Sequence, residues 1–197
     1  MNTALTEPTE QQVELQILMI LRELASEMAT ACLDAQRGTI TTLNTNAAKM
    51  RQSASESGSL TPDLKQRANA LSEQACRARE TLLRMLEDKH LLLQERIKGT
   101  TESKVTFEEV QKDFDVAMKA IATDTEEIVT IFPEGVRVFK QQCALHRDVS
   151  NQRFEAAKKE ACEKANRQFK ELTGLTESAR NILGGRLAKE LFERLTS

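Results

Sequence analysis

The amino-acid sequence predicts an all-α protein, an elongated antiparallel helical bundle or set of coiled-coil hairpins with four long helices and a short C-terminal helix. Ala, Leu, Glu, Lys, Arg and Gln dominate the composition, and these residues lose little entropy on helix formation. The 197 residues include only 3 Pro and 7 Gly, which leaves long uninterrupted segments. Apolar residues recur at spacings of three and four, and no segment alternates as a strand would. We expect one helical domain over residues 1–197.

The first helix is expected at residues 7–55, after a flexible tail at residues 1–6. Pro8 suits the first turn of a helix, where its missing N–H group is not needed. Two sets of apolar residues follow at spacings of three and four, and they lie out of phase on either side of Gly38. The sequence therefore predicts a break or kink near residue 38, with an apolar stripe that changes its partner as the alternative.

The second helix is expected at residues 61–98. Thr61, Pro62 and Asp63 supply, in order, an N-cap, a residue suited to the first turn and an acid that favours the helix N-terminus. A long apolar series at heptad spacing predicts that this helix packs lengthwise on a neighbour. Its members are Leu64, Ala68, Leu71, Ala75, Ala78, Leu82 and Met85, followed by Leu86, Leu93 and Ile97.

The third helix is expected at residues 106–132 and the fourth at residues 135–173. Thr106 and Glu109 have the spacing of a capping box, in which each side chain accepts a hydrogen bond from the backbone of the other. The stretch Phe132–Gly135 contains a proline, which disfavours the helical conformation of the residue before it. This stretch favours a turn that reverses the chain over a kink within one longer helix.

The last helix is expected at residues 176–196 and carries an apolar stripe on an otherwise polar surface. Gly184 and Gly185 lie in its interior, where each glycine costs about 1 kcal/mol relative to alanine, so this pair is a candidate hinge. The net charge of the chain alternates in sign from the first helix to the fourth, which favours antiparallel packing of consecutive helices.

Composition excludes several classes of protein. The net charge of −2 lacks the basic excess of a dedicated nucleic-acid binder. The four Cys are scattered without a CxxC pair, which indicates reduced thiols in a cytoplasmic protein. The N-terminal sequence has no basic region followed by an apolar run, so we expect no signal peptide. The longest apolar run falls far short of the ~20 residues that a membrane-spanning helix needs.

Catalytic and metal-binding patterns are weak, and we expect neither an enzyme nor a bound metal or cofactor. No phosphate loop, dinucleotide motif or zinc-protease motif occurs in the chain. Glu87 and His90 have the spacing of half a di-iron site, but the second Glu-x-x-His is missing, and a charged helix surface is the preferred interpretation. Cys143 and His146 lie one turn apart on the apolar stripe of the fourth helix, where core packing is expected rather than nucleophilic catalysis.

Five consecutive apolar residues, Ile17–Leu21, surround a full turn of the first helix. The C-terminal helix could fold back over this turn, or the turn could contact another protein, including a second copy of the chain. Membrane contact is less favoured, because the polar face of the C-terminal helix mixes acids with bases. The candidate partner-binding residues are Ile17, Ile20, Leu21, Leu24, Leu187, Leu191 and Leu195.

These observations favour a non-enzymatic, cytoplasmic adaptor or scaffold that binds other proteins through exposed helix faces. Burial of apolar side chains, at about 25 cal/mol per Å², would supply the affinity before the costs of association are subtracted. The alternative is a membrane-active bundle, either curvature-binding or pore-forming, that releases a helix. We expect protein partners, a homo-oligomer among them, and no nucleic acid.

Overall fold

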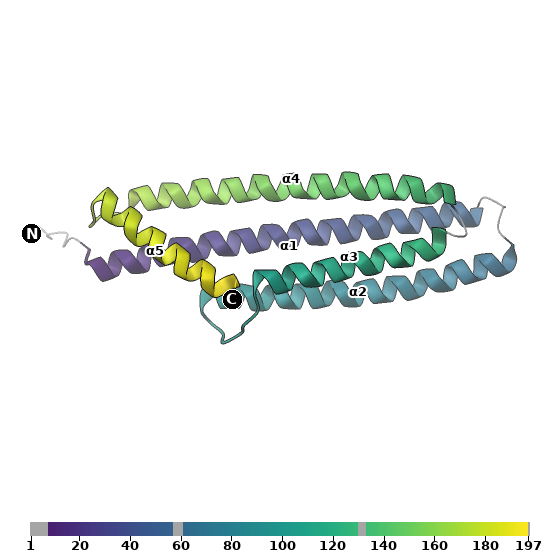
Figure 1. The fold of residues 1–197 in the computed structure, drawn as a ribbon, viewed down its shortest axis with the longest axis horizontal. Coiled ribbons are helices and arrows are strands. Elements are labelled where there is room, and N and C mark those ends of the chain that lie inside the picture. Colours follow the sequence, from purple (N-terminus) through teal and green to yellow (C-terminus); the bar gives the residue numbers. More distant parts are fainter. Residues whose placement is uncertain (1–7, 57–60, 130–132, 197) are drawn as a thin grey trace, which may run out of the picture.

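The computed structural model describes residues 8–56, 61–129 and 133–196, and over these residues the chain folds into α-helices without a strand. The longest helix has 47 residues, which corresponds to a rod of about 70 Å and accounts for the elongated molecule in Figure 1. The prediction of an all-α bundle is confirmed. The helices are α1 (Glu10–Glu56), α2 (Pro62–Lys98), α3 (Phe107–Val129), α4 (Pro133–Glu171) and α5 (Glu177–Thr196).

Helix α1 is the central element, because it contacts each of the other four helices. Figure 1 shows α2 and α4 running antiparallel to α1 on opposite sides of it, while α3 returns antiparallel to α2. Contacts also join α3 to α1 and to α4. The predicted pairing of consecutive helices therefore holds for these neighbours, and α1 with α4 is an additional pair that charge alternation did not single out.

The helix ends follow the local signals of the sequence. The hydroxyl of Thr61 accepts a hydrogen bond from the backbone N–H of Leu64, as an N-cap does. The capping box forms as expected: the N–H of Glu109 donates to Oγ1 of Thr106 at 3.1 Å, and the N–H of Thr106 donates to the Glu109 carboxylate at 3.0 Å. Observed helix bounds consequently lie within a few residues of the predicted ones.

The predicted break near residue 38 is corrected by the structure, because α1 continues without interruption from Glu10 to Glu56. Three threonine hydroxyls in this stretch donate to backbone carbonyls four residues earlier, for example Thr42 Oγ1 to the Gly38 carbonyl at 2.8 Å. Such bonds satisfy the hydroxyl groups inside the helix. The apolar residues change phase because α1 changes its partner: Leu24 borders a groove with α5, whereas Ile40 and Leu43 pack with residues of α2 and α3. This is the alternative that the sequence left open.

Two apolar clusters lie along α1. The main core joins the middle of α1 to α2 and α3; its buried members are Ala29, Ile40, Leu43, Leu86, Leu93, Ile97, Val110, Ala117 and Leu195. The end cluster lies near the start of α1, where Val13 and Ile17 pack with Leu187 of α5. Helix α1 thus turns one set of side chains toward α2 and α3 and another toward α5 and the end of α4.

Helix α5 crosses α1 obliquely and reaches the start of α3 (Figure 1). Four leucines spaced by four residues face the rest of the protein: Leu183, Leu187, Leu191 and Leu195. A row of side chains at a spacing of four is inclined to the helix axis, and packing on such a row gives crossed rather than parallel helices. The spacing therefore explains why α5 does not lie lengthwise in the bundle.

The glycine pair does not interrupt α5, which is continuous from Glu177 to Thr196. Gly184 is buried and Gly185 is exposed. A Cβ atom at Gly184 would lie 2.6 Å from Cζ of Phe169, so the absence of a side chain lets the phenyl ring rest against the helix backbone. The candidate hinge is therefore, in this structure, a place of close packing between α5 and α4.

Two expectations fall outside the described residues: the tail at residues 1–6 and Phe132, the first residue of the predicted turn. Beyond Phe132, α4 begins at Pro133 and runs antiparallel to α3, as Figure 1 shows. None of the described helices combines enough length with enough apolar character to span a lipid bilayer.

Candidate interaction site at the α1–α5 crossing

The site most suited to binding is a groove of about 260 Å³ where α5 crosses α1, bordered also by α3 and α4. We call it the apolar groove, because all of its lining residues are apolar or carry a thiol. They are Leu21, Leu24, Ala25, Met28, Cys32, Phe107, Phe154, Ala188, Leu191, Phe192 and Leu195. A surface of this kind gains free energy from burying an apolar side chain and offers few polar groups to a polar ligand.

Four of the seven predicted partner-binding residues lie together in this groove: Leu21 and Leu24 from α1, with Leu191 and Leu195 from α5. The first three are half-buried, whereas Leu195 is only 3% exposed and also belongs to the main core. Tertiary folding therefore brings residues from two distant segments into one surface. Their binding role stays a prediction.

The other three predicted residues lie elsewhere. Ile17 and Leu187 both belong to the end cluster and are 0% and 6% exposed, so in this arrangement neither can touch another molecule. Ile20 is half-buried and lines a separate groove between α1 and the end of α4. In the apolar run of α1, Met19 is the exposed member, at 68%. Residues of α5 and of the end of α4 therefore cover most of this apolar run.

Polar contacts set the position of α5. The hydroxyl of Thr176 accepts a hydrogen bond from the N–H of Ala179 and caps the helix N-terminus. Nη1 of Arg180 donates to the carbonyl groups of Phe169, Lys170 and Leu172 at the C-terminal end of α4, where helical carbonyls lack partners.

Farther along α5, an ion pair joins the helix to α1. Nη2 of Arg186 lies 3.0 Å from Oε1 of Glu14. Both side chains are substantially exposed, at 58% and 40%, so this pair selects the alignment of α5 more than it stabilises the fold. Together with the Arg180 cap, it fixes both the entry of α5 and its direction over α1.

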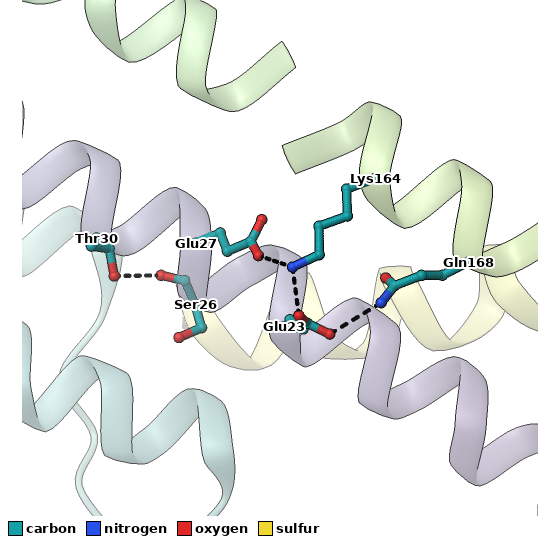
Figure 2. A network of polar contacts seen from close by, with 6 residues as sticks. All are labelled: Glu23, Ser26, Glu27, Thr30, Lys164 and Gln168. Atoms are coloured by element: carbon teal, nitrogen blue, oxygen red, sulfur yellow. Dashed lines mark hydrogen bonds and ion pairs between the residues drawn. The ribbon is translucent and has the colours of Figure 1, made fainter. Parts of the chain in front are cut away.

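An ion-pair bridge joins α4 to α1 close to this site, as Figure 2 shows. Nζ of Lys164 lies 2.7 Å from Glu23 and 2.5 Å from Glu27, and Nε2 of Gln168 donates to Glu23 at 3.4 Å. These hydrogen bonds raise the pKa of Lys164 above its ordinary value and lower the pKa of Glu23. The groups therefore stay ionised over the physiological range and keep the two helices in register.

Glu87 and His90 contact different partners. Glu87 pairs with Arg37 of α1 at 2.9 Å, and His90 is 2% exposed, which corrects the expectation that both lie on a charged helix surface. Nε2 of His90 lies 2.9 Å from Oε1 of Gln36, which is also buried. Burial, and secondarily the charge of Arg37, lowers the pKa of His90 to about 4. Within the described part of the chain, no three His, Cys, Asp or Glu side chains are grouped as metal ligands.

A second groove, of about 630 Å³, runs between α1 and α4. His146 is half-buried and lines it with Asp34, Arg153 and several small side chains of α1. The side chain of Cys143 lies outside the described residues, so the predicted Cys–His relationship has no structural description. Acidic, basic and hydroxyl side chains border this groove. It is therefore less selective for an apolar partner than the apolar groove.

Sequence reasoning missed the aromatic residues of the site. Phe107, Phe154 and Phe192 each line the apolar groove, and Phe192 is 67% exposed at its edge. Phe192 follows Leu191 directly and so lies off the four-residue leucine row of α5. The sequence position of Phe192 could have indicated this role, because a large aromatic side chain next to a buried stripe lies at the edge of that stripe and not within it.

Comparisons of the chain with protein-family models, with curated proteins and with solved structures find no match.

Proposed function

We propose that this protein is a non-enzymatic adaptor that binds another polypeptide through the apolar groove. The observation that carries the proposal is the groove itself, where apolar side chains of four helices leave about 260 Å³ unfilled. Phe192 supports it as an exposed aromatic anchor at the edge, since aromatic side chains contribute strongly to protein interfaces. The partner is a protein, a second copy of this chain included, and we place the interaction in the cytoplasm.

Photo-cross-linking from the edge of the groove tests this function. Replacing Phe192 with p-benzoylphenylalanine puts a reactive aromatic group where the partner is expected, without disturbing a buried residue. Val116 of α3, an apolar residue that is 53% exposed, receives the same group as a control. After irradiation in extracts of the source cells, we expect a defined heavier adduct from position 192 and none from position 116.

A groove-filling variant makes the test specific. Ala188 lines the groove and is half-buried, so Ala188→Phe fills the space without adding charge. Ala70 is exposed on α2, and Ala70→Phe adds the same ring away from the site. The adduct should disappear with Ala188→Phe and persist with Ala70→Phe. Equal adducts from positions 192 and 116, or an adduct that survives groove filling, would rule the proposal out.

Vesicle co-sedimentation separates the adaptor from the membrane-active alternative. Ile182 and Phe192 are 73% and 67% exposed, so Ile182→Glu with Phe192→Glu removes apolar surface and leaves the core intact. As an adaptor, the wild-type chain stays in the supernatant with anionic vesicles. Pelleting of the wild type that the double variant abolishes would replace the adaptor with a membrane-binding function.

A further inference from the structure

We propose that the outer face of α5 binds the same face of α5 in a second copy of the chain, with the two helices antiparallel. This face lies opposite the leucines that pack α5 onto the bundle, so the contact requires no rearrangement of the fold. It shares only Phe192 with the apolar groove, and the inference therefore goes beyond the proposed function.

The outer face of α5 carries large apolar side chains that the described part of the chain leaves exposed. Ile182 is 73% exposed, more than any other large apolar side chain of the described residues, and Phe192 is 67% exposed. Spacings of three and four residues place both on one side of the helix. We call this row the outer stripe; its members are Ile182, Gly185, Lys189 and Phe192.

Gly185 is a second and independent observation at the centre of the outer stripe. It lies inside a continuous helix, where glycine is among the least favourable residues. Gly184 is needed for packing, because a Cβ atom there would lie 2.6 Å from the Phe169 ring, whereas nothing in the described bundle lies within 4 Å of a Cβ at Gly185. A missing side chain on an exposed helix face allows the backbone of a second helix to approach closely.

The outer stripe is complementary to itself, which identifies the second helix as another copy of α5. Its spacings of three, four and three residues read the same in both directions along the chain. A two-fold axis midway between Ile182 and Phe192 therefore sets Ile182 of each copy beside Phe192 of the other. The same axis sets Lys189 beside Gly185 of the other copy, where the apolar stem of the lysine can lie over the glycine.

Charged side chains next to the outer stripe favour the antiparallel orientation. Two bases, Arg186 and Lys189, precede two acids, Glu190 and Glu193, and these side chains are 58% to 76% exposed. Antiparallel helices bring the basic part of each copy toward the acidic part of the other, whereas parallel helices set like charges side by side. The ion pairs of these residues within α5 are long, at 3.8 Å, so the charges stay available to a second copy.

The length of α5 limits the strength of this association. The helix has 20 residues and is about 30 Å long. A contact between two such helices lies near or below the ~1,200 Å² of buried surface at which stable interfaces begin. We therefore expect a reversible dimer that forms in the micromolar concentration range.

Analytical ultracentrifugation of the purified full-length chain tests the association. The mass should rise with concentration from 22.1 kDa toward twice that value. Ile182→Ser with Phe192→Ser should weaken the dimer about tenfold or more. Leu15→Ser with Met19→Ser is the matched control, because these side chains of α1 are 61% and 68% exposed, and it should leave the dimer unchanged. A monomer at every concentration, or equal weakening by both double variants, would overturn the proposal.

Gly185→Lys tests the close approach without removing apolar surface. The new side chain meets Lys189 of the other copy, so the dimer should weaken about tenfold or more while the fold of the monomer is retained. Gly38 is also an exposed helical glycine with open space around it, and Gly38→Lys should leave the dimer unchanged. Equal association of both variants with the wild type would contradict the proposed contact.

Disulfide formation under mild oxidation tests the orientation. In chains whose exposed Cys76 is replaced by serine, an Ile182→Cys chain mixed with a tagged Phe192→Cys chain should give a covalent dimer containing one of each. Covalent dimers from each variant alone would show parallel helices and contradict the proposal.

These experiments separate the dimer from the proposed function, because the purified chain contains no other protein. In cell extracts, an adduct of position 192 with another protein reads the adaptor, whatever the result for the dimer. A monomeric chain that pellets with anionic vesicles through Ile182 and Phe192 would assign the outer stripe to a membrane surface and overturn the dimer.

Discussion

Nε2 of His90 on α2 lies 2.9 Å from the amide oxygen of Gln36 on α1, in a buried part of the core. The amide nitrogen of Gln36 in turn donates to Oε1 of Gln111 on α3 at 3.3 Å, so one polar chain links three helices. Because Nδ1 of His90 has no hydrogen-bond partner, a proton added there would be buried without compensation. The neutral ring therefore belongs to the folded state.

This arrangement predicts that acid destabilises the fold. The pKa of His90 is lowered from its ordinary value of 6.5 to about 4, so between these values the unfolded chain binds more protons than the folded one. Stability should be full above pH 6.5, fall as the pH decreases toward 4, and lose up to about 3 kcal/mol from this group. Urea unfolding of the wild type and of His90→Gln across this range measures it. Equal pH slopes for the two proteins would refute the assignment.

The apolar run of α1 predicts opposite outcomes at neighbouring positions. Ile17 is fully buried in the end cluster, so Ile17→Ala should reduce the free energy of unfolding by about 2–5 kcal/mol through lost burial and a new cavity. Met19 is 68% exposed, and Met19→Ala should change the free energy of unfolding by less than about 0.5 kcal/mol. Denaturant midpoints provide the comparison. Similar losses in both variants would place α5 somewhere other than over Ile17.

Two glycine substitutions test the backbone conformation at Gly174 and the continuity of α1 at Gly38. Gly174, between α4 and α5, has φ of 92°, and a Cβ there would lie 2.7 Å from Cγ of Pro8. Gly174→Ala should therefore destabilise the protein by about 1–3 kcal/mol. Gly38 lies inside the continuous α1 helix with open space around it, so Gly38→Ala should stabilise by up to about 1 kcal/mol. Thermal unfolding measures both changes, and destabilisation by Gly38→Ala would favour the break in α1 that the structure lacks.

The Lys164 bridge predicts a salt-dependent contribution to stability. Lys164→Gln removes the contacts with Glu23 and Glu27, and the thermal midpoint should fall at low ionic strength. The difference from the wild type should vanish near 1 M NaCl, where the Debye length is about 3 Å. Lys159→Gln is the control, because Lys159 pairs only weakly, at 3.9 Å, with Glu163 of its own helix. A salt-independent loss with Lys164→Gln would indicate packing of the lysine stem instead.

Local sequence signals were sufficient for the positions of the helices. Thr61 and the Thr106–Glu109 capping box act through neighbours within three or four residues, so their effect does not depend on the rest of the fold. Weak helix formers around Gly38 suggested a break, yet the helix continues there. Ile40 and Leu43, just beyond it, bury their side chains against α2 and α3, and this packing outweighs the local propensity.

The residues that line the apolar groove were only partly predictable. Apolar composition identified Leu21 and Leu191, but it could not distinguish residues that line a groove from Ile17 and Leu187, which are buried in the end cluster. The buried His90 was also missed, because polar residues are ordinarily exposed. Its spacing of four from Leu86 and three from Leu93, both buried, was the available signal.

By itself, the sequence determined the all-α class and, in the described residues, most of the helix ends, because capping, proline and the three-and-four spacing of apolar residues act within a few residues of the chain. Only the tertiary structure decided that α5 crosses α1, that Gly184 accommodates Phe169 and that four helices leave an apolar groove between them. Those features depend on which surfaces meet and how completely they fill the space between them, and contacts between side chains of different helices settle both.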